Sequence, residues 1–123
     1  MSKKVLIVDD EANIRKLVRL SLKDDGYELH EAQNGEEALS VANKVKPDLV
    51  ILDLMMPDKW GYDVCEELKS NPETKNIIVI FLTARESQPS KKLGEIKGGD
   101  DFMVKPFSLV ELRDKVRKLL GLS

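Results

Sequence analysis

Short apolar runs alternate along the chain with segments in which apolar residues recur every three or four positions. Three of the runs, at 5–8, 49–52 and 77–82, are uninterrupted and rich in β-branched residues, which is typical of strands covered on both faces of a parallel sheet. Two others, at 27–31 and 102–104, are alternating or short and fit the edges of a sheet. The pattern therefore predicts five strands.

Helical periodicity fills the intervals between these runs. Apolar stripes at 14–22, 38–45, 62–68 and 109–120 have the spacing of amphipathic helices. The segment 87–97 carries only two apolar residues and an internal glycine, so we expect a short, weakly stable helix there. In the last helical segment, Ser108 and Glu111 have the spacing of a capping box.

The order of elements is a strand followed by a helix, repeated five times. Such units close with right-handed crossovers and form an open parallel sheet with helices on both faces. We therefore predict an α/β fold, with residues 1–123 forming a single doubly wound (βα)5 domain.

The composition favours a globular cytoplasmic protein. Of 123 residues, 41% are hydrophobic and 34% charged, and the net charge of −2 argues against a general binder of nucleic acid or of a membrane surface. No apolar run approaches the roughly 20 residues of a membrane span. Because Cys65 and His30 are single, neither a disulfide framework nor a soft-metal cluster is available, and any metal must be bound by oxygen.

Polar side chains follow the apolar runs where the strands end. Asp9 and Asp10 follow the first run, Asp53 the second, Thr83 the third and Lys105 the last. The carboxyl ends of parallel strands meet at one rim of the sheet, where ligands bind. Crowded carboxylates repel one another unless a cation is present, and an oxygen-only donor set suits Mg²⁺ or Mn²⁺. We expect a divalent-metal site at this rim.

Asp53 is the predicted nucleophile of the rim. It stands alone after a buried strand, between the acidic pair and the strand of Lys105. A carboxylate can attack phosphorus to form an acyl phosphate while a metal and an ammonium group neutralise the developing charge. A single Asp at a strand end often only caps the next turn, but five polar residues at corresponding strand ends favour a site.

The combination resembles the receiver domains of response regulators in two-component signalling, over about residues 4–120. The resemblance rests on the acidic pair Asp9-Asp10, on Asp53 within the segment 49–57, on Thr83-Ala84, and on the segment 99–107. It implies a flavodoxin-like sheet of strand order 2-1-3-4-5. It also implies that Asp53 accepts a phosphoryl group from a phosphohistidine of a sensor histidine kinase.

The resemblance assigns a metal site. Asp10, Asp53 and the backbone carbonyl of Met55 would bind Mg²⁺, for which Mn²⁺ could substitute, and Asp9 would act indirectly. Lys105 would contact the phosphoryl group. The side chain of Met55, over the entrance, would tune the lifetime of the phosphate.

The same resemblance assigns a phosphate contact and a switch. Thr83 and Ala84 would bind phosphoryl oxygens, and Thr83 and Phe102 would form a switch pair. The bond before Pro106 is expected to be cis. Arg85, near the mouth, would steer or slow loss of the phosphoryl group, although a solvated loop charge is an equally good interpretation.

Phosphorylation would change the face formed by the predicted helix at 87–97, the strand at 102–104 and the last helix, and so control a partner. The protein is thus expected to be a switch and not an enzyme. Its partner would be an effector protein or an output domain of its own, with no direct contact to nucleic acid or membrane. A homodimer through the same face would use ion pairs of Asp100 and Asp101 with Lys115.

Other interpretations stay open. A stand-alone regulator competes with the amino-terminal fragment of a DNA-binding response regulator. A small Mg²⁺-dependent phosphatase with an Asp nucleophile would need a general acid two positions after Asp53, where the chain has Met55. A nucleotide- or flavin-binding module would need a glycine-rich phosphate loop, and the sequence has none of the usual form.

The chain departs from the family pattern at two positions. Trp60 replaces the usual Asp before Gly61, and we expect it to be exposed beside the site. Phe102 replaces the usual Tyr, so the switch ring lacks a hydroxyl and its outward state is less favoured. We interpret Cys65 as a core residue and His30 as a surface residue.

Overall fold

The computed structural model of the chain describes residues 2–84 and 98–122; the predicted helix at 87–97 and Arg85 lie outside the described residues. Within those residues, the strands form one parallel sheet in the order β2-β1-β3-β4-β5. The sheet order confirms the prediction. The strands are β1 (Lys4–Val8), β2 (Glu28–Ala32), β3 (Leu49–Asp53), β4 (Ile78–Thr83) and β5 (Asp101–Val104).

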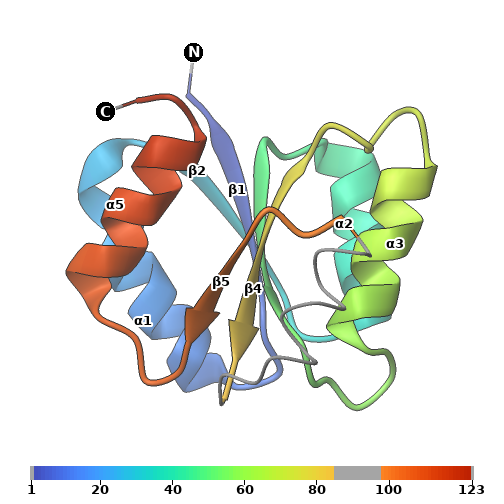
Figure 1. The fold of residues 1–123 in the computed structure, drawn as a ribbon, viewed down its shortest axis with the longest axis horizontal. Helices are drawn as coiled ribbons and strands as arrows, with labels where there is room; N and C mark the ends of the chain where they lie inside the picture. The colour runs from blue at the N-terminus through green and yellow to red at the C-terminus, as the bar shows by residue number, and fades with distance from the viewer. Residues whose placement is uncertain (1, 85–97, 123) are drawn as a thin grey trace.

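Helices cover both faces of the sheet (Figure 1). Helices α1 and α5 lie on one face, and α2 and α3 lie on the other. Their bounds are α1 (Ala12–Leu22), followed by the short 3₁₀ turn η1 (Lys23–Asp25), then α2 (Gly35–Val45), α3 (Gly61–Ser70) and α5 (Leu109–Leu119). The predicted doubly wound arrangement is therefore confirmed.

The sheet separates two apolar clusters, because successive side chains of a strand point to opposite faces. In β1, Val5 and Ile7 pack toward α1 and α5, whereas Leu6 and Val8 pack toward α2 and α3. One predicted stripe residue is misplaced: Leu17 of α1 is 42% exposed, and Ser21 takes a buried position beside Leu22 instead. Hydrophobic spacing defines a stripe wider than the part of the helix that meets the sheet.

Strand bounds differ by a residue from those of the apolar runs. Asp53 and Thr83 are the last residues of their strands and not the first residues after them. The reason is that pairing is a property of the backbone: the Leu54 amide still donates to the Leu82 carbonyl at 3.0 Å, and the Lys105 amide to the Thr83 carbonyl at 2.7 Å.

Local signals end and begin the helices as expected. Gly26 follows η1 with a φ of 74°, a left-handed conformation that glycine adopts without strain. The Ser108 hydroxyl accepts a hydrogen bond from the Glu111 amide at 3.2 Å, as one half of the predicted capping box. None of the helices in the described part of the chain has the length and apolar character needed to cross a bilayer.

Candidate functional site

Three carboxylates meet at the carboxyl ends of β1 and β3. One oxygen from each of Asp9, Asp10 and Asp53 lies within 4.8 Å of the others. The chain order reverses between these two neighbouring strands, since β2 lies on one side of the pair and β4 on the other. This is the switch point at which doubly wound sheets bind ligands. Asp9 and Asp53 are buried, while Asp10 is exposed.

Lys105 brings a cation to the two buried carboxylates. Its ammonium group lies 2.8 Å from Asp9 Oδ2 and 3.4 Å from Asp53 Oδ1. Lys105 follows β5, and β4 separates that strand from β3, so its long side chain reaches across one strand. The Lys105–Pro106 peptide is cis, as the resemblance implied. The ammonium group is shared unequally and sits closer to Asp9.

The electrostatics of the cluster differ between its members. Burial, reinforced by repulsion from Asp9, raises the pKa of Asp53 to about 6, and attraction to Lys105 offsets only part of that rise. Burial tends to lower the pKa of Lys105, but the hydrogen bond and charge of Asp9 and the charge of Asp53 outweigh it and raise the pKa. The ammonium group therefore stays charged at neutral pH. The ionised form of Asp53, in contrast, is electrostatically unfavourable.

The chemistry of this donor set fits a hard divalent cation. Three carboxylates against one ammonium group leave an excess of negative charge, and the clustered ligand atoms are all oxygen. Asp9 is the most engaged of the three: its Oδ1 accepts from the Glu11 amide at 2.9 Å and its Oδ2 contacts Lys105. Asp10 and Asp53 have the greater freedom to take up a metal.

Two apolar side chains lie on the loop that follows Asp53. Met55 is 68% exposed and forms a backbone bridge with Trp60, which is 57% exposed as expected. The Trp60 ring stacks on Tyr62, with centroids 6.4 Å apart. The Met55 amide donates to Asp53 Oδ1 at 3.4 Å, so the loop backbone contacts the central carboxylate directly.

Sequence reasoning missed the structural contacts of two residues: Asp58 of the same loop and Gly61, the first residue of α3. Asp58 accepts from the Gly35 and Glu36 amides at 2.9 Å each, at the first turn of α2, and these bonds lower its pKa. Gly61 approaches the backbone of β3 so closely that an added Cβ would lie 2.5 Å from the Asp53 carbonyl oxygen. No spacing signal marks either contact, because both partners come from other parts of the chain.

The predicted switch residues lie on β4 and β5. Thr83 is partly buried at the carboxyl end of β4, paired in register with Val104, and Ala84 follows it as an exposed residue. The Phe102 ring is partly buried and lies 5.4 Å from that of Phe81, on the α2 and α3 side of the sheet. The structure thus places the Phe102 ring against the core.

Cys65 and His30, interpreted as a core and a surface residue, lie in the core and at the surface. Cys65 is fully buried in the core, and burial raises the pKa of its thiol to about 11. His30 lies partly exposed on β2 and pairs with Glu28 at 2.6 Å.

The acidic residues predicted to form ion pairs across a dimer form ion pairs within the chain instead. Asp101 lies 3.1 Å from Lys115, and Asp100 lies 3.3 Å from Lys69. Asp100 also accepts from the Val79 amide at 2.8 Å. A local partner is available to each acid, so these ion pairs give no evidence of a second subunit.

Comparisons with known proteins identify the family. The family model for the response regulator receiver domain matches residues 5–117. The alkaline phosphatase synthesis transcriptional regulatory protein PhoP of Bacillus subtilis is 41% identical over 120 residues, which cover 98% of this chain and 49% of that protein. The chain spans about half the length of the curated relatives it matches.

Solved structures agree with this match. The chemotaxis response regulator CheY4 of Vibrio cholerae superposes with a TM-score of 0.91 at 33% identity, covering 97% of this chain and 99% of that one. The response regulator DrrB, an OmpR/PhoB homolog of Thermotoga maritima, superposes with a TM-score of 0.89 at 31% identity, covering 98% and 54%. Similar structures therefore include both a chain of this length and a longer one.

Proposed function

This chain belongs to the family of response regulator receiver domains, and from that membership we propose that residues 1–123 form one receiver domain whose phosphoacceptor is Asp53. Receiver domains are signalling switches of two-component systems. The observation that supports Asp53 most directly is its position: a buried carboxylate at the switch point, flanked by two further carboxylates and by Lys105.

The proposed reaction is phosphoryl transfer from a phosphohistidine of a sensor histidine kinase. An Asp53 carboxylate oxygen attacks phosphorus, the phosphorus–nitrogen bond of the donor breaks, and its electron pair stays on the imidazole. An acyl phosphate forms on Asp53. The attack needs an ionised carboxylate, and a pKa of about 6 leaves most of Asp53 ionised at neutral pH. Lys105 offers an ammonium group to the phosphoryl oxygens.

Asp10, Asp53 and the backbone carbonyl of Met55 are the residues we propose to hold Mg²⁺ or Mn²⁺. When bound, the metal supplies charge neutralisation to the carboxylates and to the transferring group. Asp9 would support the site indirectly, because both its oxygens are already engaged by the Glu11 amide and Lys105. The exposed Met55 side chain would tune the lifetime of the phosphate. We propose that Arg85 also affects this lifetime.

The output would be a change of surface. We propose that Thr83 and Ala84 bind phosphoryl oxygens and that Thr83 and Phe102 act as the switch pair. Phe102 is on β5, whose neighbour β4 carries Thr83, so a movement at one strand end can reach the other strand directly. The affected face would include β5, α5 and the predicted helix at 87–97, and we propose a cytoplasmic location with the kinase.

The partner that reads this face belongs to one of two classes. Curated relatives that are about twice as long include transcriptional regulators, which supports an output domain beyond the receiver. CheY4 is similar over nearly its whole length, which supports a separate effector protein. In both cases we propose that this domain itself contacts protein and not nucleic acid.

The proposal is tested by labelling the protein with a phosphorylated kinase or a small acyl phosphate in the presence of Mg²⁺. We expect one phosphoryl group per chain by mass spectrometry, and none in Asp53→Asn. Asp63→Asn, an exposed Asp on α3, is the matched control and should be labelled like the wild type. Full labelling of Asp53→Asn would exclude Asp53 as the acceptor.

A further inference from the structure

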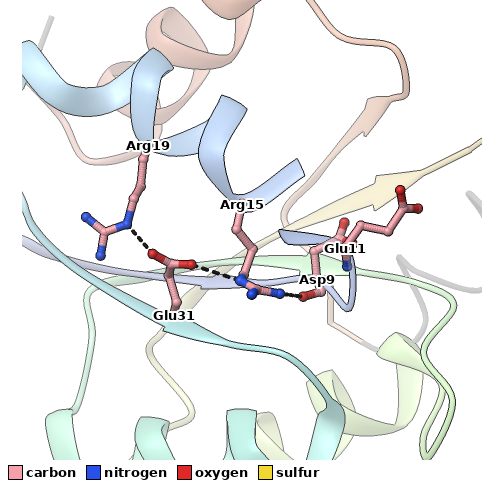
Figure 2. Close-up of polar contacts among 5 residues, drawn as sticks. All are labelled: Asp9, Glu11, Arg15, Arg19 and Glu31. Carbon is pink, nitrogen blue, oxygen red and sulfur yellow. Dashed lines mark hydrogen bonds and ion pairs between the residues drawn. The ribbon is translucent and has the colours of Figure 1, made fainter. Parts of the chain in front are cut away.

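Arg15, in the first turns of α1, joins the end of β1 to the neighbouring strand β2 (Figure 2). One of its terminal nitrogens, Nη1, donates to the backbone carbonyl of Asp9 at 2.6 Å. Its Nε donates to Glu31 Oε1 at 2.8 Å. The side chain is 16% exposed, so both contacts are partly shielded from water.

The peptide that Arg15 contacts determines how the acidic pair is presented. Side chains of consecutive residues in an extended strand point in opposite directions, yet Asp9 and Asp10 both reach the same cluster. The chain must therefore turn at this point. The Asp9 amide still donates to β2, to the Ala32 carbonyl at 3.2 Å, whereas the Asp9 carbonyl accepts from Arg15. Arg15 thus restrains the peptide between the two acids.

Glu31 restrains Arg15 in turn. Its two oxygens are divided between Arg15 and Arg19, with one guanidinium nitrogen on each (Figure 2). Burial tends to raise the pKa of Glu31, but the hydrogen bonds from Arg19 and Arg15 outweigh it, so the carboxylate stays ionised at neutral pH. A planar guanidinium group held at two points keeps a fixed orientation, which a lysine ammonium group in the same place would not.

We infer that Arg15 is a positioning residue of the metal site: it fixes the Asp9–Asp10 peptide so that the Asp10 carboxylate is presented to Mg²⁺ together with Asp53. The inference rests on the proposed Mg²⁺ site and deepens it. Arg15 makes its contact through a backbone carbonyl and not through the carboxylates, so it acts on the geometry of the metal ligands and not as a ligand.

A positioning role and a charge effect predict opposite changes in Mg²⁺ affinity when Arg15 is replaced. Arg15 is a cation close to an acidic cluster, and removing a positive charge there would by itself strengthen binding of Mg²⁺. If Arg15 positions the peptide, removing it weakens binding despite the favourable change of charge. Losing a partner that orients metal ligands typically costs about 10- to 100-fold in affinity, and we expect a loss in that range for Arg15→Gln.

The test is calorimetric titration of the metal-free protein with Mg²⁺, well below the unfolding temperature of each variant. Arg15→Gln and Arg15→Lys should both bind about 10- to 100-fold more weakly, since lysine restores the charge but not the two-point contact. Arg19→Gln is the matched control: it removes the same charge from the same Glu31 without touching Asp9, and should stay within about twofold of the wild type. The Mg²⁺ concentration at half-maximal labelling by an acyl phosphate should shift in parallel.

The outcomes separate the two proposals. A wild type that gives no Mg²⁺-binding heat overturns the proposed metal site itself. A wild type that binds Mg²⁺, with Arg15→Gln equal or tighter, overturns only the positioning role, and full recovery in Arg15→Lys would overturn the need for a guanidinium group held at two points. If neither Arg15 variant folds, as judged by circular dichroism, the residue is a requirement of the fold and the inference is also overturned.

Discussion

Replacing Asp53 by Asn should stabilise the fold at neutral pH, although it removes the proposed phosphoacceptor. The Asp53 side chain is only 8% exposed, and Asp9 lies beside it within the same cluster. Asn keeps the shape of the side chain and removes its charge. The substitution therefore relieves both the burial of a charge and the repulsion from Asp9, at the loss of one 3.4 Å contact with Lys105.

The magnitude follows from the pKa of Asp53. Its value rises from 3.8 to about 6, and the contribution of Lys105 is already included in that net change. One pKa unit corresponds to about 1.4 kcal/mol, so ionised Asp53 lowers the free energy of unfolding by about 3 kcal/mol at pH 7. This is the gain expected for Asp53→Asn without metal.

The direction of the pKa shift determines how this destabilisation changes with pH. The folded pKa of Asp53 lies above the unfolded one, so the folded state holds its proton more tightly and the destabilisation is absent below about pH 3.8. It grows as the pH rises through the window between 3.8 and about 6 and is complete above it. The difference between variant and wild type should therefore fall from about 3 kcal/mol at pH 7 to about 1.6 kcal/mol at pH 5.

Urea unfolding of both proteins at pH 5 and pH 7, in the presence of a chelator, measures this difference. The exposed variant Asp63→Asn controls for a general effect of net charge. Equal stability of Asp53→Asn and wild type at pH 7, or a difference that does not shrink at pH 5, would refute the argument that Asp53 is held in an unfavourable ionised state.

Two further predictions concern the neighbours of Asp53. Lys105→Met leaves Asp9 buried without its cation and should cost about 3–5 kcal/mol in urea unfolding at pH 7, whereas a loss below about 1 kcal/mol would mean that Asp9 is solvated. Gly61→Ala places a Cβ against the backbone of β3, 2.5 Å from the Asp53 carbonyl oxygen. It should cost about 1–3 kcal/mol and slow labelling of Asp53, and wild-type stability together with wild-type labelling would contradict the close approach.

The sheet could be predicted because its three central strands, β1, β3 and β4, are buried on both faces. The runs at 49–52 and 77–82 are short, uninterrupted and rich in β-branched residues, which favours buried strands over helices. Strand ends were less predictable: Asp53 and Thr83 belong to their strands although neither continues the apolar run. The exposure of Leu17 on α1 likewise depends on how that helix docks, which its spacing does not specify.

The carboxylates and Lys105 could be predicted as a cluster because each follows a recognisable strand, and parallel strands end at one rim. Their supports could not. Arg15 meets Glu31 across 16 positions, and Asp58 meets Gly35 across 23. In the sequence, each of these residues looks like an ordinary polar residue of an exposed helix or loop. Their partners are specified only when α1 and α2 are packed, so the turn of the Asp9–Asp10 peptide and the anchoring of the loop at Asp58 are tertiary properties.

Lys105 contacts two neighbouring buried carboxylates unequally, and this helps to give Asp9 and Asp53 different electrostatic environments. Asp9 receives the closer contacts, at 2.8 Å from Lys105 and 2.9 Å from the Glu11 amide, whereas the Met55 amide lies 3.4 Å from Asp53 Oδ1. Burial and the charge of Asp9 raise the pKa of Asp53, and its longer contact with Lys105, at 3.4 Å, offsets only part of that rise. Protonation of Asp53 or a bound cation therefore relieves this unfavourable energy, whereas an acyl phosphate moves the negative charge onto phosphoryl oxygens that Lys105 and the proposed metal would have to compensate. The carboxylate that destabilises the resting fold is thus one that a bound cation would stabilise directly.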